Sequence, residues 1–473
     1  MILQARSVTR RALLKASAGL CASGWLHGSE GLAGFVRVSP RNRRYFELSS
    51  GAPFIPIGVN LVNLPHPDVE RGLATMEDWL SHLSANGGNF TRVWLSSEFW
   101  DVEHARSGEY DSAKAARIDK LLELCRKYRI RAKLTMEHFR RFSGEPAWSR
   151  KAIHDVSQGG PAASIADFFD GERSRAQFKR KIRWYADRYG ERPEIFGWEL
   201  WNEVDCVGGG DYAAWTRVML AELHRAFPHT LAMQSLGSFD KDGKREKYRC
   251  FATMEGNDVV QVHRYLDLGA ALDVCRGPVD VLAADAVREM LAFSADKPVL
   301  LAESGAVEPR HSGPFRLYAK DREGIILHDV VFAPFFTGAA GTGQNWHWND
   351  YVAQNNLWHH FARFQEAVKG LDPITEEPRP EIVRHERLRV YALRGRRTFL
   401  AWCRDSRNTW QSELANGEKP ESLRNLEIKI DPASSGKARI YDPWSNQWSH
   451  AQVSGGRVKL PEFSRSIVVS IAS

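Results

Sequence analysis

The sequence predicts an α/β fold: a (β/α)8 TIM barrel followed by a small C-terminal all-β sandwich domain. Eight short apolar runs of strand type each lead through a polar loop into a segment with helical periodicity. Beyond a Pro-rich stretch the pattern changes to short alternating runs separated by Gly, Pro and Asn turns. With 473 residues, 43% of them hydrophobic and 26% charged, the chain has room for one large and one smaller domain.

The first residues have the pattern of a bacterial twin-arginine export signal. Arg10 and Arg11 stand with Lys15 before a stretch rich in Ala, Gly and Ser. An arginine pair also occurs by chance or at the start of an ordinary helix, but we expect residues 1–34 to direct export to the periplasm or the medium. No later stretch reaches the roughly 18 consecutive apolar residues of a membrane span, so we expect no membrane contact after signal removal.

Charge and cysteine usage exclude several classes of partner. Residues 1–34 carry four basic residues and one acidic residue, so their removal lowers the net charge from +7 to +4, and we expect no nucleic-acid partner. The six cysteines lack the close pairs of a zinc ribbon or redox motif. Cys250 and Cys275 either pair after export or stay free as buried thiols. The oligomeric state stays open.

The expected barrel domain spans residues 35–372. An alternating segment at 44–54 turns at Gly51, which predicts a hairpin that caps the barrel floor. The eight expected strands are 54–60, 89–95, 131–137, 195–203, 230–235, 259–265, 298–303 and 341–346. Helical periodicity marks 76–85, 113–128, 175–189, 212–226, 285–294 and 357–368, and Gly87, Gly190 and Gly370 stand where three of these helices end.

A short linker and a β domain follow the barrel. The Pro-rich stretch predicts the linker at 373–380, and the expected β-sandwich is residues 381–473. Its expected strands are 388–393, 398–403, 426–430, 437–441 and 466–471. Trp444 or Trp448 could bind glycan there, but small domains of this kind more often pack against a barrel, and we expect that structural role.

Two strand ends carry carboxylic acids suited to catalysis. Residues 197–203 read Gly-Trp-Glu-Leu-Trp-Asn-Glu, which places Glu203 at the C-terminal end of the fourth strand, where barrel enzymes hold their active sites. The seventh strand ends in Glu303, followed by the small residues Ser and Gly. Glycosidic bonds are hydrolysed by two carboxyl groups on either side of the scissile bond. The sequence therefore predicts Glu203 and Glu303 as a catalytic pair.

This combination resembles the clan A retaining glycoside hydrolases, among which the family-five mannanases and cellulases are the nearest familiar members. The resemblance covers about residues 54–370. Its motifs are Trp-Asn202-Glu203, His263-Arg-Tyr265, Ala-Glu303 and the region of Trp346. It implies that Glu203 serves as acid and then as base, and that Glu303 forms the glycosyl-enzyme.

The same resemblance assigns the substrate-binding set. These residues are Arg92, His138, Asn202, His263, Tyr265 and Trp346. It implies that Asn202 hydrogen-bonds the sugar 2-hydroxyl, that Arg92 lies beneath the nucleophile and keeps it ionised, and that Trp346 lies under the sugar ring. His263 and Tyr265 alternate along one strand, so both can point inward, and the tyrosine hydroxyl is expected to contact the nucleophile.

Each of these residues also has a structural interpretation when taken alone. Glu303 could be only a partner of Arg92, and His263 and Tyr265 could be core residues. Their joint occurrence at matching strand ends favours a site. Among the 16 tryptophans we expect Trp94, Trp198 and Trp201 in the core or wall, and the better ligand candidates are Trp100, Trp346 and Trp348.

We therefore expect a glycosidase, a retaining O-glycoside hydrolase that acts on β-linked oligo- or polysaccharide of the β-mannan or β-glucan type. The alternatives are an exo-acting β-glycosidase of the same clan and a catalytically silent barrel that only binds glycans. We expect no metal or cofactor, because His347, Asp350 and the pair at 359–360 lack a ligand spacing and no Gly-rich dinucleotide loop follows the first strand. Substrate choice is expected to depend on the long loops at 139–173 and 237–257.

Overall fold

The computed structural model describes residues 32–138, 140–141, 150–430 and 436–472, which belong to one compact unit that begins at residue 32. Nearly all of the expected export signal, up to residue 31, lies outside these residues, so the signal stays a prediction. No helix in the described ranges is long and apolar enough to cross a membrane.

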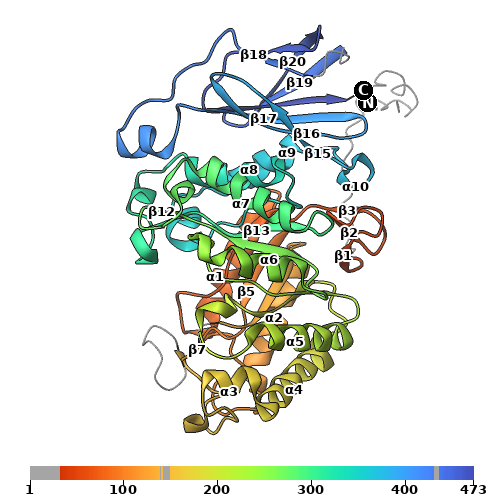
Figure 1. The fold of residues 1–473 in the computed structure, drawn as a ribbon, viewed down its shortest axis with the longest axis vertical. Coiled ribbons are helices and arrows are strands. Elements are labelled where there is room, and N and C mark those ends of the chain that lie inside the picture. The colour runs from red at the N-terminus through yellow and green to blue at the C-terminus, as the bar shows by residue number, and fades with distance from the viewer. Residues whose placement is uncertain (1–31, 139, 142–149, 431–435, 473) are drawn as a thin grey trace, which may run out of the picture. The chain divides into compact units, whose positions relative to one another are not determined.

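Parallel strands form the centre of the larger domain (Figure 1). Five of them pair in the order β10–β9–β6–β5–β4, and two more form the pair β11–β13. The strands are β4 (Gly58–Asn60), β5 (Phe90–Trp94), β6 (Arg131–Glu137), β9 (Ile195–Trp201), β10 (Leu231–Met233), β11 (Val260–His263) and β13 (Val299–Glu303). Each falls within one of the eight expected runs. All their side chains are buried, as in a parallel sheet covered on both faces.

The eighth expected run, residues 341–346, makes only an isolated parallel bridge, between Ser304 and Asn345. Its backbone is nevertheless hydrogen-bonded on two sides. Gln344 N donates to Leu301 O of β13 at 2.9 Å, and Asn60 N of β4 donates to Asn345 O at 3.3 Å. The segment therefore lies between β13 and β4 without regular strand pairing, and the parallel sheet has five strands where a barrel of eight was expected.

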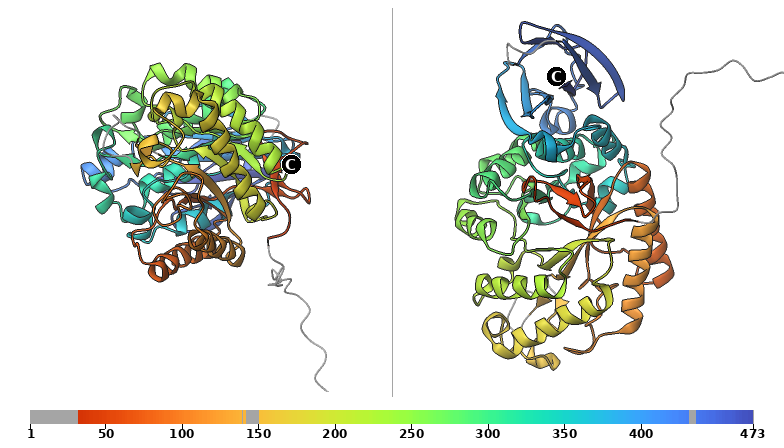
Figure 2. Two further views of the ribbon diagram at one scale, coloured as in Figure 1. Left: turned by 90° about the horizontal axis from the view of Figure 1, so that it is seen from below. Right: turned by 90° about the vertical axis from the view of Figure 1, so that its right-hand side faces the viewer.

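Helices pack around these strands (Figures 1 and 2). The longer ones are α1 (Val69–Ala85), α2 (Ser112–Lys127), α4 (Glu172–Tyr189), α5 (Tyr212–Ala226), α6 (Arg245–Thr253), α7 (Val279–Phe293), α8 (Ile325–Phe336) and α9 (His359–Ala367). The six helices expected from periodicity are present. Helix α8 was not expected, because every one of its residues is buried and the sequence shows no polar face.

The N-terminal hairpin is present and gains a strand. It contains β1 (Val36–Val38), β2 (Phe46–Leu48) and β3 (Pro53–Phe54), which pair antiparallel in sequence order. Gly51 turns the chain between β2 and β3 with a φ of +87°. The rings of Phe46 and Phe54 lie 5.1 and 6.1 Å from that of Phe196, near the start of β9. The hairpin therefore covers the N-terminal end of this strand.

The C-terminal strands form one antiparallel sheet of eight strands, in the order β15–β16–β17–β22–β19–β20–β21–β18. They are β15 (Arg379–Val383), β16 (Leu388–Arg394), β17 (Thr398–Asp405), β18 (Glu427–Lys429), β19 (Gly436–Asp442), β20 (Gln447–Ser454), β21 (Arg457–Lys459) and β22 (Ser466–Ala472). The sheet curls, nearly closed, around an apolar core that includes Ile428, Ile440 and Val469. The expected sandwich of two sheets is thus replaced by a single strongly curved sheet, which strand twist permits.

Buried polar contacts join this sheet to the helices beside it. Asp329 of α8 accepts from Arg404 of β17 at 2.8 Å, and Asp280 of α7 accepts from Arg389 of β16 at 2.6 Å. In the predicted linker, residues 373–380, the structure has the short helix α10 (Pro373–Glu376) and the start of β15.

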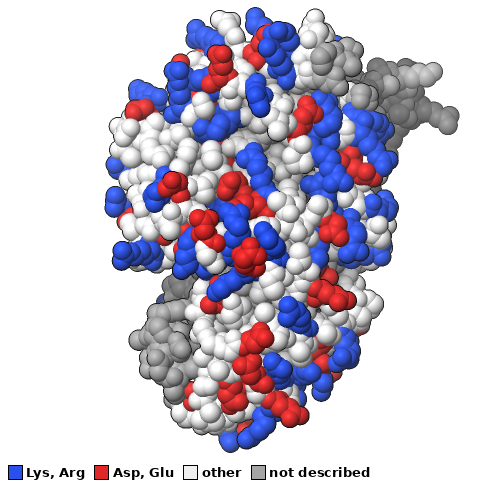
Figure 3. All heavy atoms as spheres, viewed as in Figure 1, with Lys and Arg blue, Asp and Glu red and all other residues white. Residues whose placement is uncertain are grey.

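The two tryptophans considered for glycan binding in the β domain make packing contacts. Trp448 Nε1 donates to Glu366 of α9 at 3.0 Å, and Trp444 Nε1 donates to Ser466 Oγ at 2.9 Å. Both indole N–H groups are therefore engaged within the protein, which fits the structural role expected of this domain. On the face drawn in Figure 3, basic and acidic side chains are interspersed.

Candidate active site

The two predicted carboxylic acids come from strand ends and approach each other. Glu203 lies two residues past the end of β9, after Asn202, in a left-handed conformation with φ 53° and ψ 55°, and its N–H donates to Ser235 Oγ at 3.1 Å. Such strained conformations in non-glycine residues concentrate at functional sites. Glu303 is the last residue of β13. Only 13% of the Glu203 side chain and 4% of the Glu303 side chain are exposed.

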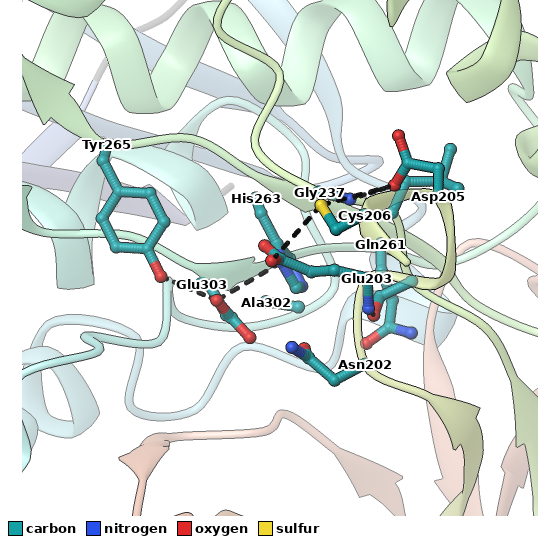
Figure 4. Close-up of polar contacts among 12 residues, drawn as sticks. Asn202, Glu203, Asp205, Cys206, Gly237, Gln261, His263, Tyr265, Ala302 and Glu303 are labelled. Atoms are coloured by element: carbon teal, nitrogen blue, oxygen red, sulfur yellow. Dashed lines mark hydrogen bonds and ion pairs between the residues drawn. The ribbon is translucent and has the colours of Figure 1, made fainter. Parts of the chain in front are cut away.

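His263 contacts both acids (Figure 4). Its Nδ1 lies 2.8 Å from Glu203 Oε1 and 3.3 Å from Glu303 Oε2. One oxygen of each carboxyl group and one ring nitrogen of His263 all lie within 4.8 Å of one another. The register of β11 against β13 shifts at Val262/His263, and the irregularity places His263 beside Glu303.

Tyr265 and Arg92 hold Glu303 from two sides. The Tyr265 hydroxyl donates to Glu303 Oε2 at 2.7 Å, and Arg92 Nη1 pairs with Oε1. Arg92 Nη2 also donates to Asn202 Oδ1 at 2.6 Å. Because the amide oxygen of Asn202 is engaged in this way, its NH2 group is the donor that remains for a ligand. These contacts match those expected from the resemblance.

The surroundings shift the pKa values of the two acids unequally. Burial and the neighbouring Glu303 raise the pKa of Glu203 well above its ordinary value. Burial also raises the pKa of Glu303, but the Arg92 charge and the hydrogen bonds from Tyr265 and Arg92 oppose this rise. The low pKa expected for Glu303 is therefore not found, because burial outweighs Arg92. Because these opposing contacts act on Glu303, its ionisation is still favoured before that of Glu203. A site with one nucleophile and one acid requires this difference.

A buried polar layer below the acids was missed by the sequence analysis. Glu199 Oε2 accepts from Arg92 Nε at 2.8 Å and from Thr135 Oγ1 at 2.5 Å, and Lys133 Nζ lies 3.8 Å from Oε1. Although burial opposes it, the charges of Arg92 and Lys133 lower the pKa of Glu199 to about 2. This layer fixes the guanidinium that contacts Glu303. The polar residues that alternate with apolar ones within strand runs, as at 131–137, were the signal that could have indicated this layer.

The two acids open into a cavity of about 780 Å³. Trp346 lines it, as predicted, with its ring 5.1 Å from that of Trp94, which also lines the cavity. His138 stacks on Trp94 at 4.7 Å and lies 2.6 Å from Ser96 Oγ, and it is absent from the described lining. Trp100 is fully buried, so the expectation that it offers a sugar platform is wrong.

Residues in loops and short elements between the expected strands complete the cavity wall, and the sequence analysis did not single them out. They are Cys206, Ser238, Asp240, Lys244, Val307, Arg310, His311, Gly313 and Pro314. Three of them fall in the loop at 237–257 that was expected to influence substrate choice. Lys244 Nζ lies 3.4 Å from Asp205 and adds positive charge beside Glu203. Loops have no periodic pattern, so nothing in the sequence indicated which of their residues face the cavity.

Two groups in the described part of the chain have three side chains of metal-ligand type. One is the site itself, Glu203, His263 and Glu303. In the other, Glu103 and Glu137 lie with His154, but the Lys181 ammonium pairs with both carboxylates and lies 3.0 Å from Glu103 Oε2. Lys181 therefore supplies the positive charge in that group. The five cysteines in the described residues, including Cys250 and Cys275, are free.

Comparisons with known proteins relate this geometry to a family. No family model matches the chain. Mannan endo-1,4-beta-mannosidase 3 of Oryza sativa subsp. japonica is 26% identical over 385 residues, which cover 74% of this chain and 75% of that protein. A glycoside hydrolase family 5 structure from Bacteroides vulgatus superposes with a TM-score of 0.60 at 14% identity, covering 93% of each chain. The chain is a glycosidase that is similar to the glycoside hydrolases of family 5.

The predicted resemblance to clan A glycoside hydrolases of the family-5 type and the predicted enzyme class are thereby confirmed. A further similar structure is the exo-beta-1,4-mannosidase Op5Man5 from an Opitutaceae bacterium, with a TM-score of 0.50 and 18% identity, covering 70% of this chain and 62% of that one. At such identities the structural likenesses concern the fold. Among proteins similar to this glycosidase are therefore both an endo-acting and an exo-acting enzyme.

Proposed function

We propose that this glycosidase hydrolyses β-linked saccharides of the mannan type by a retaining double displacement. The observation that carries the proposal is the approach of Glu203 and Glu303, with carboxyl oxygens within 4.8 Å of each other. Retaining enzymes hold their carboxyl groups about 5–5.5 Å apart, whereas inverting enzymes leave about 6.5–9.5 Å for a water molecule. The mannan-type substrate is supported by the names of the similar proteins.

In the first step Glu303 is the nucleophile and Glu203 the acid. The Glu303 carboxylate forms a bond to the anomeric carbon while the bond from that carbon to the glycosidic oxygen breaks. The Glu203 proton passes to that oxygen, and the leaving group departs as an alcohol. Burial keeps Glu203 protonated for this task, and Arg92 with Tyr265 favours the ionised form of Glu303.

In the second step Glu203 becomes the base. It takes a proton from a water molecule whose oxygen attacks the anomeric carbon, and the ester bond to Glu303 breaks. Both carboxyl groups then return to their starting protonation states. The NH2 group of Asn202, oriented by Arg92, supplies a donor for a sugar hydroxyl, and Trp346 offers an aromatic face to the ring.

A complete eight-stranded barrel is part of the proposal. Residues 341–346 would be its eighth strand, supported by the hydrogen bonds from Gln344 N to Leu301 O and from Asn60 N to Asn345 O. These bonds tie the segment to strands on both sides.

Export through a twin-arginine signal at residues 1–34 is proposed from the sequence alone, and cell fractionation of an Arg10→Lys, Arg11→Lys variant tests it.

Substrates with different leaving groups distinguish the roles of the two acids. Activity of the purified protein is measured on aryl β-mannosides, aryl β-glucosides, β-mannan and β-glucan. We expect the mannosides and mannan to be preferred and Glu303→Gln to be inactive on all of them. Glu203→Gln should keep more activity on an aryl mannoside with an acidic phenol than on mannan, because that phenol leaves without protonation. Equal losses on both substrates would assign Glu203 another role.

A further inference from the structure

Four charged side chains meet in the interior of the larger domain, at and below the position of Glu303. Arg92 of β5 and Lys133 of β6 are register partners on neighbouring parallel strands, and Glu199 of β9 lies against both. The side chains of Arg92, Lys133 and Glu199 are fully buried, and only 4% of the Glu303 side chain is exposed. We call these four residues the charge cluster. With Glu303 ionised, it holds two positive and two negative charges away from water.

The contacts within the cluster divide one guanidinium between two acids. Arg92 Nε donates to Glu199 Oε2 at 2.8 Å, and Arg92 Nη1 pairs with Glu303 Oε1. Lys133 Nζ donates to Gln261 Oε1 and lies 3.8 Å from Glu199 Oε1. Gln261 Nε2 in turn donates to the same Glu199 oxygen at 3.2 Å. Because Arg92 serves both carboxylates, it cannot alone balance the charge of Glu303, and Lys133 supplies the second positive charge.

The other ionisable side chains that contact Glu303, or share its cavity edge with it, add no charge at neutral pH. Burial lowers the pKa of His263 well below its ordinary value, so the imidazole is neutral. Burial and the neighbouring Glu303 raise the pKa of Glu203 well above its ordinary value, which keeps this acid protonated. Burial likewise raises the pKa of the Tyr265 hydroxyl. The charge that Glu303 experiences at close range therefore comes from the other three members of the cluster.

Loss of the Lys133 charge would leave two buried carboxylates against one guanidinium. An unbalanced charge in a protein interior is costly, and a buried group responds by changing its protonation. Glu199 has a pKa of about 2 and accepts from Arg92 and Thr135, so it is the harder of the two acids to protonate. Glu303, whose pKa burial already raises, would take up the proton first.

Lys133 is itself charged in the pH range where this matters. Burial and the Arg92 charge lower the pKa of Lys133 to about 7, against the opposing charges of Glu199 and Glu303. Below that pH the ammonium is protonated. It is therefore present at the acidic pH values at which Glu303 takes up its proton.

We propose that Lys133 is a positioning residue of the reaction, whose ammonium provides the second counter-charge of the cluster and so keeps Glu303 ionised for attack. The inference rests on the proposed function, in which Glu303 is the nucleophile. Lys133 acts from below through Glu199 and Gln261 and does not line the cavity in the part of the chain that the structure describes.

The test is the pH dependence of kcat/KM for an aryl β-mannoside in variants that change the charge of the cluster. Lys133→Met, of similar volume, should move the acid limb to higher pH and lower kcat/KM about tenfold at a pH on that limb. Glu199→Gln removes a charge that raises the pKa of Glu303, so it should move the limb to lower pH. The double variant keeps one positive and one negative charge and should return the limb close to its wild-type position.

An exposed lysine and a second readout complete the design. Lys120→Met on the surface of α2 is the matched control and should leave the limb unmoved. The infrared band of the protonated Glu303 carboxyl group, identified by its loss in Glu303→Gln, should appear at higher pH in Lys133→Met than in the wild type. This band needs no substrate. Lys133→Gln, which also lacks the charge, should give the same shift and replaces the Met variant if that one does not fold.

Two outcomes would overturn the inference while leaving the proposed function intact. One is an acid limb and an infrared band that stay in place when the Lys133 charge is removed. The other is a shift in the same direction in Lys133→Met and Glu199→Gln, which a general disturbance of the interior would produce. If the wild type does not hydrolyse the mannoside, the proposed function fails, and the infrared band still decides whether Lys133 controls the ionisation of Glu303.

Discussion

Tyr265 donates a hydrogen bond to Oε2 of Glu303 at 2.7 Å from the neighbouring parallel segment of the chain. The other oxygen of this carboxylate pairs with Arg92, whose guanidinium is in turn fixed by Glu199. The proposed nucleophile is thus oriented at both oxygens before any substrate binds. Fixed donors of this kind lower the cost of reorganisation during the reaction.

Tyr265→Phe should lower kcat/KM about ten- to a hundredfold, because a hydrogen bond to a charged group contributes about 1.5–3 kcal/mol. The hydroxyl lowers the pKa of Glu303, so its loss raises that pKa. The acid limb of the pH–rate profile should therefore move to higher pH. Tyr189→Phe, which removes a buried hydroxyl that donates to the Ala115 carbonyl at 3.1 Å, is the control. If the acid limb does not shift, Tyr265 does not influence the ionisation of Glu303.

Lys244→Met should move the basic limb of the same profile. The Lys244 charge lowers the pKa of Glu203, so its removal raises that pKa and keeps the acid protonated to higher pH. Activity should then decline at higher pH than in the wild type. Lys247→Met is a matched control, because Lys247 is another lysine close to Asp205, at 3.6 Å, and is more exposed than Lys244. A basic limb that shifts equally in both variants would argue against a specific effect of Lys244.

Asp280→Ala should destabilise the protein by about 3–5 kcal/mol, the usual cost of removing one partner from a buried ion pair. Asp280 is fully buried and accepts hydrogen bonds from Arg389 and Tyr391 of the β domain. Urea unfolding measures the change in free energy of unfolding. Asp273→Ala, which removes a 92% exposed partner of Arg276, should change stability little. Similar decreases in the free energy of unfolding in both variants would show that the buried contacts of Asp280 do not stabilise the packing of the sheet.

The sequence was sufficient to place the two acids at strand ends, but not to find the buried layer of Glu199, Lys133 and Thr135 on the same strands. A carboxylic acid at the end of an apolar run can be located because parallel strands end at one edge of the sheet, and Glu203 and Glu303 meet as this rule requires. The alternation of His263 and Tyr265 likewise predicted that both would point inward, and the resemblance implied the contact between the tyrosine hydroxyl and Glu303.

Features that depend on three-dimensional packing could not be predicted in this way. Helix α8 is buried on all sides and has no polar face. Its sequence therefore lacks the helical periodicity by which the other helices were predicted. Lys244 and Arg310 reach the cavity from loops, where spacing gives no direction. The alternating runs of the β domain indicated five strands, but neither β15, β20 and β21 nor the pairing of all eight strands in one curved sheet.

The most direct test of the account is the anomeric configuration of the first product released from an aryl β-mannoside, followed by NMR before mutarotation. Double displacement through Glu303 predicts β-mannose as the initial product. Initial formation of α-mannose would mean a single displacement by water and would contradict the proposed roles of Glu203 and Glu303.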